Sequence, residues 1–199
     1  MTPALVLVAL AQSPDAPQAV TDEAPPTEQA PNLVVPTLHG VALLGGMRLV
    51  EAVIWPNPFA KTWQWTAHYE ETFTKPPIFD ADKPFMRWDG DPLVVNVVGH
   101  GLLGSELYMR PRMCNVPWYG ALAFAAAGST LWEYVFEGNG VRPSAQDLVY
   151  TPLAGIVLGE ARYGLVRLSR TIESKEWRSV LRSVADPFGE IERVAGAPC

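Results

Sequence analysis

Ionisable residues interrupt the most apolar part of this chain, and they limit the folds that it can adopt. His100 lies in the run VVNVVGHGLLGSE, and Glu160 follows GIVLG. Glu133 and Glu137 are four residues apart in STLWEYVFE, a spacing that places both on one face of a helix. A buried carboxylate is costly unless a partner compensates its charge. The segments that carry these residues must therefore pack so that the ionisable side chains meet one another or a cation.

Three apolar segments between residues 92 and 168 have the pattern of helices. The second, 118–137, is rich in alanine and ends at a Gly-Asn-Gly sequence, which favours a helix with a glycine stop. The third opens at Ser144, a predicted N-cap with Asp147 at the third helical position. It continues to about residue 169, with a kink expected at Pro152.

Segments on either side of this region add two further helices. Apolar residues recur with a three-to-four period over 38–55, and a charged amphipathic pattern covers 171–184. An irregular tail is expected from Asp186 onward. The aromatic, proline-punctuated stretch before residue 91 predicts irregular loops with a short helix near 59–72.

These elements predict an all-α fold, a small bundle of about four helices wrapped by an irregular, aromatic-rich N-terminal half. The alternative is an α+β fold in which VVNVV forms a strand. We expect a single helical domain over 37–199, with its core at 88–184.

The leading segment differs from the bundle in composition. Residues 1–11 contain a short apolar run that ends in Ala-Leu-Ala, which favours a secretory signal peptide, although a plain apolar tail has the same composition. Residues 12–36 are rich in proline, alanine and acidic residues, and they predict a disordered linker.

Several classes of function are disfavoured. The net charge of −6 argues against a nucleic-acid surface. The G-x-G-x-x-G match at 99–104 lacks the acidic residue that dinucleotide sites need about 20 positions later, so we expect no nucleotide or other organic cofactor, and close helix packing explains the glycines better. Two cysteines are too few for a disulfide framework or a zinc site. We therefore expect Cys114 to be a core residue and Cys199 to be a mobile terminal residue.

Three interpretations of the ionisable residues remain open. They form a buried salt-bridge network that holds the helices in register, or His100 and the glutamates bind a divalent metal. In the third interpretation, a carboxylate and His100 act as acid and base in a hydrolase or transferase.

The motifs resemble a bacterial family known as domain of unknown function family 3943. The resemblance covers Trp88 to Gly196 through RWDGDPLVVNVVGHGLLGSELYMRPR, GSTLWEYVFEG, RPSAQDLVYTPLAGIVLGEARYGL and DPFGEIERVAG. One departure is that family members often carry His-Pro where His100 is followed by Gly101. The resemblance implies a cell-envelope protein with an export signal, and it implies no established reaction. Other motif positions are Asp89, Asp91, Asn96, Gly104, Tyr108, Trp132, Tyr134, Pro143, Leu148, Thr151, Gly155, Gly159, Pro187, Gly189 and Arg193.

Residue pattern and resemblance together predict one polar cluster between the helices. Its members are His100, Arg112, Glu133, Glu137, Asp147 and Glu160. We expect a membrane-associated envelope protein, periplasmic or bound to a membrane, with a structural or binding role around this cluster and a membrane lipid or envelope component as partner. The alternative is a hydrolase or transferase that acts on a lipid or envelope polymer, with His100 and Glu133 as acid and base.

Overall fold

The computed structural model describes residues 30–196 and 199, so the predicted signal peptide at 1–11 and most of the predicted linker at 12–36 lie outside the described residues. Within the described part the chain forms helices and no strand, which confirms the all-α prediction. The helices are α1 (Val34–Ile54), α2 (Pro56–Phe59), α3 (Trp65–Thr74), α4 (His100–Met113), α5 (Trp118–Leu131), α6 (Ala145–Ser169), α7 (Lys175–Ala185) and α8 (Pro187–Val194).

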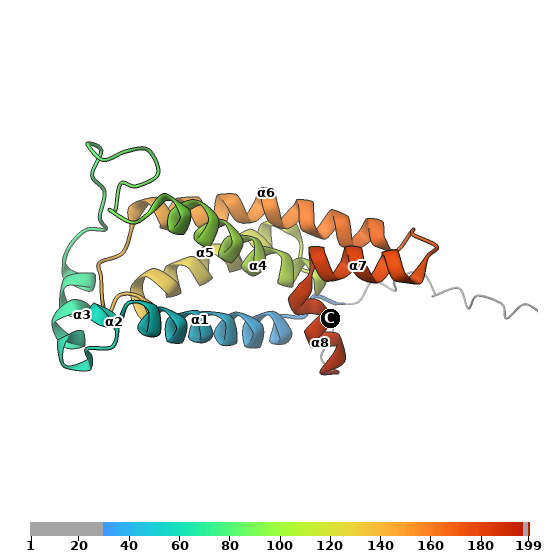
Figure 1. Ribbon diagram of the computed structural model, residues 1–199, viewed down its shortest axis with the longest axis horizontal. Helices are drawn as coiled ribbons and strands as arrows, with labels where there is room; N and C mark the ends of the chain where they lie inside the picture. The colour runs from blue at the N-terminus through green and yellow to red at the C-terminus, as the bar shows by residue number, and fades with distance from the viewer. Residues whose placement is uncertain (1–29, 197–198) are drawn as a thin grey trace, which may run out of the picture.

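Four helices make the body of the bundle. In Figure 1, α1 and α6 run along opposite sides, with α4 and α5 between them. The short helices α2 and α3 lie at one end, and α7 and α8 lie at the other. The aromatic segment before α4 is irregular apart from α2, α3 and a 3-10 turn at Thr62–Gln64, so this prediction is confirmed.

The alternative α+β fold is wrong, because VVNVV is helical. Residues Val94–Gly99 form a π-helical turn, labelled η2, that runs directly into α4. A second π-helical turn, η3 (Trp132–Phe136), follows α5. β-branched residues favour strands, but among the described residues this segment has no strand to pair with, and it continues directly into α4.

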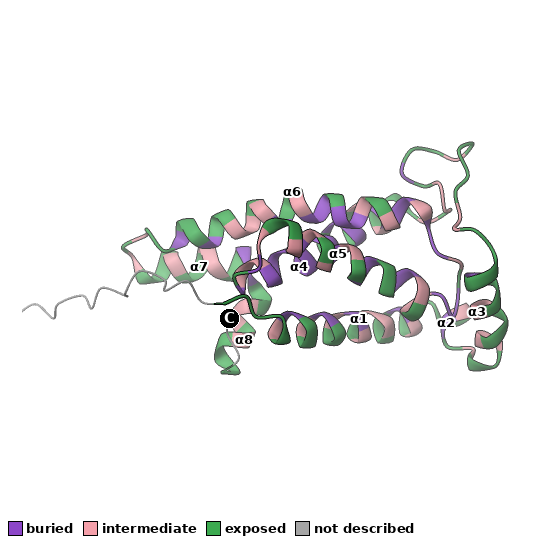
Figure 2. Ribbon diagram, turned by 180° about the vertical axis from the view of Figure 1, so that it is seen from behind, coloured by how far each residue is buried: buried purple, intermediate pink, exposed green. Residues whose placement is uncertain are grey.

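The core surrounds α4, which is buried on nearly every side. Buried residues in Figure 2 concentrate on α4 and on the faces of its neighbours that meet it, while the outer side of α1 is exposed. Leu103, Leu107 and Tyr108 of α4 pack with Leu44 of α1 and Trp132 of η3. A helix that is buried all round must have neighbours on all sides, so α4 sets the position of the other elements.

Glycines allow α4 and α6 to approach closely. A Cβ atom on Gly104 would overlap the carbonyl oxygen of Thr151, and one on Gly155 would lie 2.7 Å from the carbonyl oxygen of Gly104. The helix-packing explanation of these glycines is therefore confirmed.

Two local predictions need correction. The segment after Asp186 is helical, because Asp186 caps α8 by accepting a hydrogen bond from the Gly189 amide at 2.9 Å and Pro187 occupies the first helical position. The first long helix begins at Val34, four residues before the predicted start.

Candidate functional site

Three buried side chains from three elements meet beside the core. His100 is the first residue of α4, Glu133 lies in η3 and Asp147 lies in the first turn of α6. Each offers a ligand atom, and these atoms all lie within 4.8 Å of one another. We call these three residues the buried triad; their exposed fractions are 6%, 2% and 1%.

The start of α6 explains how Asp147 comes to face His100. Ser144 caps the helix as predicted, and its side chain accepts a hydrogen bond from the Asp147 amide at 3.2 Å. In a capping box the third helical residue would accept the bond from the cap's own amide. Here the Ser144 amide donates instead to Glu133 Oε2 at 2.7 Å. The Asp147 carboxylate is therefore free to approach His100, with 3.7 Å between Oδ2 and Nε2.

A second layer of polar residues orients the triad. The other ring nitrogen of His100, Nδ1, is 2.9 Å from Thr151 Oγ1. Asp89 accepts hydrogen bonds from Ser144 Oγ and Asn96 Nδ2, both at 2.8 Å. The resemblance motifs had singled out Asp89, Asn96 and Thr151, whereas apolar periodicity gave no sign that they belong here.

The triad carries acids that no basic side chain compensates. Burial lowers the pKa of His100 to about 4, so its imidazole is neutral at pH 7. Burial, together with a hydrogen bond to Asp89, raises the pKa of Asp147 to about 8, and burial also raises the pKa of Glu133 well above its usual value. Among the described residues, no Lys or Arg forms an ion pair with the triad. Glu133 Oε1 is buried and has no hydrogen-bond partner.

The other three predicted cluster residues lie elsewhere. Glu137 faces a cavity next to the triad together with Glu51. Arg112 and Glu160 form an ion pair of 2.6 Å, which Tyr108 joins through its hydroxyl. Arg112 comes twelve residues after His100 on α4, about 18 Å along the helix axis, so the prediction that all six residues converge is wrong for this pair.

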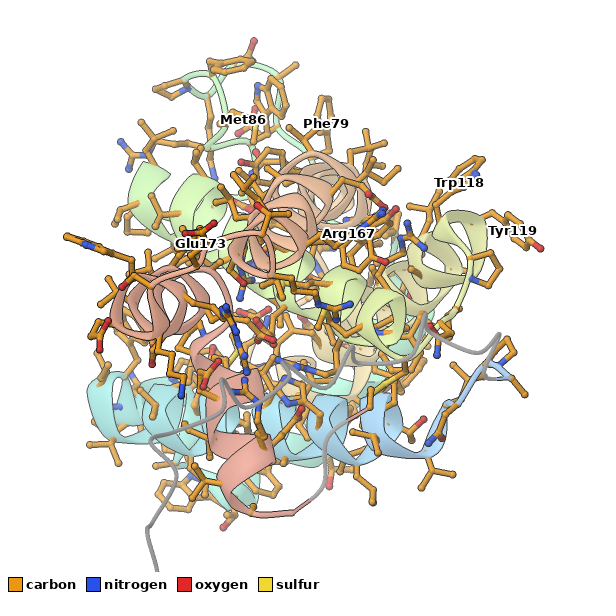
Figure 3. The ribbon with its side chains drawn as sticks, turned by 90° about the vertical axis from the view of Figure 1, so that its right-hand side faces the viewer. Phe79, Met86, Trp118, Tyr119, Arg167 and Glu173 are labelled. Carbon is orange, nitrogen blue, oxygen red and sulfur yellow. A yellow bond between two sulfur atoms is a disulfide. The ribbon has the colours of Figure 1, made fainter. Side chains whose placement is uncertain are left out.

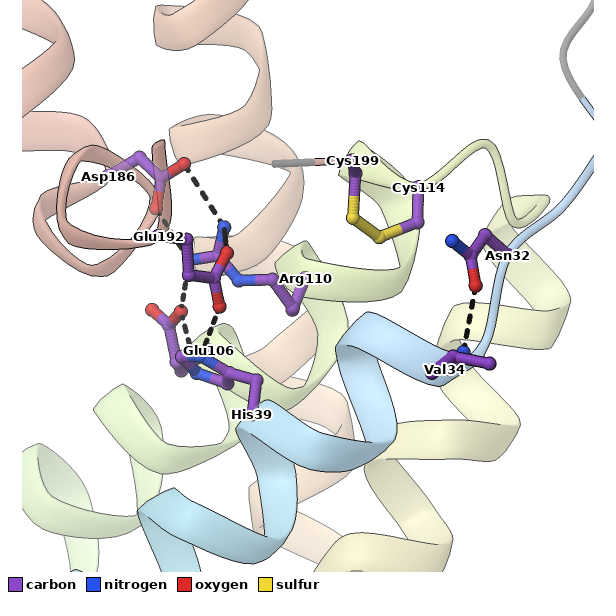
Figure 4. Close-up of a disulfide and its surroundings, with 9 residues drawn as sticks. All are labelled: Asn32, Val34, His39, Glu106, Arg110, Cys114, Asp186, Glu192 and Cys199. Carbon is purple, nitrogen blue, oxygen red and sulfur yellow. Dashed lines mark hydrogen bonds and ion pairs between the residues drawn. A yellow bond between two sulfur atoms is a disulfide. The ribbon is translucent and has the colours of Figure 1, made fainter. Parts of the chain in front are cut away.

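A true salt-bridge network does exist around Arg110, a candidate cation by its sequence position, but its acids and Arg162 carried no sequence signal that we used. Glu106 Oε1 accepts from Arg110 at 2.8 Å and Glu106 Oε2 accepts from Arg162 at 2.6 Å. Arg110 also pairs with Asp186 at 2.7 Å and with Glu192 at 3.1 Å. Figure 4 shows Glu106, Arg110, Asp186 and Glu192 of this group with His39 of α1. The four-residue spacing of Glu106 and Arg110 within an apolar helix was the signal that could have identified it.

The cysteines also differ from expectation. A disulfide joins Cys114, just after α4, to Cys199, with 4.7 Å between their Cα atoms. Figure 4 places this bond close to the network around Arg110. Cys114 is buried, as predicted, but Cys199 is tied to it rather than free.

A cavity of about 490 Å³ lies between one face of α1 and the residues of η2, α4 and η3 that are near it. Its wall is mostly apolar, and it includes His100 and Glu137. The triad therefore touches this space through one of its three members.

Comparison with known proteins gives one match. A family described as Domain of unknown function (DUF3943) matches residues 85–188, slightly more than half of the chain. The matched range contains the buried triad, whereas α1 lies before it. No curated protein and no solved structure matches the chain.

Proposed function

The chain belongs to the DUF3943 family, and from this premise and the site geometry we propose that it is a membrane-associated envelope protein that binds a divalent metal ion at the buried triad. The observation that carries the metal proposal is the unpartnered oxygen Glu133 Oε1, buried beside an imidazole and a second carboxylate. The triad has no Arg or Lys ion-pair partner among the described residues, and the pKa values of Asp147 and Glu133 are raised. A divalent cation that displaced the protons of these acids would supply the missing positive charge.

The donor geometry suits a transition-metal ion. Metal–ligand bonds of about 2.1 Å in a tetrahedral site put ligand atoms roughly 3.4 Å apart, close to the 3.7 Å between His100 Nε2 and Asp147 Oδ2. Thr151 holds Nδ1 of His100, which leaves Nε2 for a metal in the arrangement common to metal-binding histidines. One imidazole with two carboxylates favours Zn²⁺ or Mn²⁺ over Ca²⁺, which prefers a cage of oxygens.

Metal titration tests this proposal. We expect isothermal titration with Zn²⁺ and Mn²⁺ to show one ion per chain, with binding weakened by at least about 100-fold in Asp147→Asn and Glu133→Gln. Glu160→Gln is the matched control, because Glu160 lies on the same helix as Asp147 but pairs with Arg112. Circular dichroism establishes that each variant is folded. Equal affinity in all four proteins, or no binding by the wild type, would rule out the site.

The membrane part of the proposal rests on exposed apolar surface. Helix α1 is long and apolar enough to cross a membrane by length and composition, and only 17% of its most apolar window is buried. One face of α7 exposes Trp177, Val180 and Val184 beside basic residues, the pattern of a helix that lies on a membrane surface. Trp118 and Tyr119 project outward from the start of α5 (Figure 3).

The envelope location is supported by the disulfide. Disulfides persist in oxidising compartments such as the bacterial periplasm and are rare in the cytosol. The bond between Cys114 and Cys199 is therefore consistent with export, which the predicted signal peptide would direct.

Vesicle sedimentation tests membrane association. We expect the protein to sediment with vesicles of phosphatidylethanolamine and phosphatidylglycerol, and Trp177→Ser to reduce the bound fraction several-fold. Trp63→Ser is the control, because Trp63 is also exposed but lies near α3, at the opposite end of the bundle from α7. The same loss in both variants, or no sedimentation of the wild type, would contradict a role for α7.

A second candidate is a hydrolase or transferase that acts on a lipid or envelope polymer. The observation that favours it is that His100, neutral at pH 7, lines the cavity and is therefore available as a base. Turnover of an ester or phosphoester lipid that disappears in His100→Ala, with the melting temperature retained, would support it. A structural role predicts the reverse, a lower melting temperature and no turnover by the wild type.

A further inference from the structure

The cavity beside α1 is elongated. Its wall extends from His39 in α1 to Trp55 just after the helix, and the sixteen residue-to-residue steps between them span about 24 Å at the helical rise. The α1 residues that line it follow the three-to-four spacing of one helix face, so the cavity runs along the helix rather than across it. They are His39, Ala42, Leu43, Gly46, Met47, Val50 and Glu51.

The volume is sufficient for a chain-shaped ligand. About 490 Å³ lies within the range of small-molecule sites. Spread along a wall of this length, that volume accommodates one extended hydrocarbon chain.

The lining chemistry favours an uncharged, apolar occupant. Leu43, Met47 and Val50 of α1 line the cavity together with Leu103 and Trp132. Two carboxyl groups, Glu51 and Glu137, also line the cavity. Burial, followed by the charge of Glu133, raises the pKa of Glu137 well above the usual value.

Position in the molecule indicates where such a chain would come from. Gly46, Val50 and Trp55 line the cavity and are also exposed at the surface, so the cavity opens along α1. The outer side of the same helix exposes Leu38, Val41, Leu49 and Val53. A helix of this composition on a membrane surface would bring the opening next to lipid acyl chains.

We propose that the cavity between α1 and the bundle binds one extended acyl chain of a membrane phospholipid, with His100 in its wall. This inference rests on the membrane association proposed above. It names a phospholipid acyl chain as the molecule that the buried triad would act on or sense.

A cavity-filling variant tests the inference. A side chain added at Gly46 would meet no atom within 4 Å, so Gly46→Leu should fold and fill part of the cavity. Gly45→Leu is the matched control, because Gly45 is the preceding residue, is equally uncrowded and does not line the cavity. The probes are cis-parinaric acid, a fluorescent fatty acid, and lysophosphatidylglycerol as its competitor.

We expect the wild type and Gly45→Leu to bind cis-parinaric acid and to release it to lysophosphatidylglycerol, and Gly46→Leu to bind at least about tenfold more weakly, because the leucine occupies the chain's volume. No binding by the wild type, or equal binding by the two variants, would overturn the inference. Displacement by free fatty acid but not by the lysophospholipid would also overturn it, because the occupant would then not be a phospholipid chain.

The same proteins separate this inference from the metal and membrane proposals. Zn²⁺ titration and vesicle sedimentation of Gly46→Leu should match the wild type, since neither the triad nor α7 is changed. Metal or vesicle binding that fails in every protein while cis-parinaric acid binds would remove the proposed function and leave a lipid cavity. Metal and vesicle binding without chain binding would do the opposite.

Discussion

Glu133 accepts a hydrogen bond that Asp147 would otherwise accept, which leaves the Asp147 carboxylate available for another contact. Because Glu133 accepts the Ser144 amide, Asp147 does not have to complete the cap of its own helix. The helix start is thus satisfied by a residue from another element, and the local carboxylate turns toward His100. A capping arrangement that depends on a tertiary contact ties the start of α6 to the position of η3.

Glu106 is expected to be the most sensitive single acid in the fold. It is 3% exposed and bonds to both Arg110 and Arg162. Glu106→Gln should lower the free energy of unfolding by roughly 3 kcal/mol, because it leaves the Arg162 guanidinium without its carboxylate partner and removes one of the three carboxylates around Arg110. Urea unfolding followed by circular dichroism measures this loss. Glu71→Gln is the control, since Glu71 pairs with Lys75 on the surface and its loss should change nothing measurable. A similar midpoint for both variants would contradict the expectation.

The same residue gives the fold a pH dependence in acid. Burial alone would raise the pKa of Glu106, but contact with His39 and the charges of Arg110 and Arg162 outweigh it and lower the pKa from 4.5 to about 2. The unfolded chain therefore binds the proton first as the pH falls. The stability that Glu106 contributes is fully present above pH 4.5 and is lost as the pH falls toward 2.

Unfolding midpoints measured across this pH window check the dependence. The wild type should lose stability more steeply than Glu106→Gln between pH 4.5 and 2, so the two curves should converge at the acid end. Parallel curves would show that Glu106 does not titrate as its surroundings indicate.

Among the elements, α4 and α6 have the closest contact. Gly104→Ala would drive a methyl group into the Thr151 carbonyl, so the helices must separate. We expect a loss of about 2 to 3 kcal/mol in the free energy of unfolding. Because His100 is on α4 and Asp147 on α6, weaker Zn²⁺ binding should accompany it.

Gly164→Ala is the matched control for this contact. It changes the same residue type on α6, where a side chain would meet nothing within 4 Å, and it should raise stability by up to about 1 kcal/mol through helix propensity. Unchanged unfolding and metal binding in Gly104→Ala would mean that the two helices tolerate a wider separation.

At the scale of the helices, the sequence could predict only those features that neighbouring residues along the chain determine. The helical class, the Ser144 cap and the glycine contacts follow from propensity, capping chemistry and spacing, which neighbouring residues determine. The ion-pair partner of each charged residue depends instead on the position along one helix at which another helix packs against it. Arg112 and Glu160 were therefore assigned to the wrong cluster, and the network around Glu106 was missed. The π-helical turns before His100 and around Glu133 have no such local signal.

Across the whole molecule, the two polar groups at the ends of α4 differ in how their charges are balanced. Near its C-terminal half, the acids around Glu106 are matched by arginines from α4 and α6, and this group connects α1, α4, α6 and α8. Near its N-terminal end, the buried triad has acids without arginines and touches a cavity. The first arrangement holds the helices together, whereas the second is the site at which we propose that a divalent cation binds.

The disulfide lies at the same end of the bundle as the salt-bridge network around Arg110. It links Cys114, four residues after Arg110, to Cys199 beyond α8, the helix whose Glu192 pairs with Arg110. The 85 residues between the two cysteines make a long loop, and closing a loop of that length stabilises the folded state by up to about 4 kcal/mol through the entropy of the unfolded chain.

Cys199→Ser should therefore lower the urea midpoint, and a reductant should bring the wild type to the same value while leaving the variant unchanged. Free thiols in unreduced protein exported to the periplasm, or equal midpoints with and without reductant, would show that this bond does not hold the C-terminus.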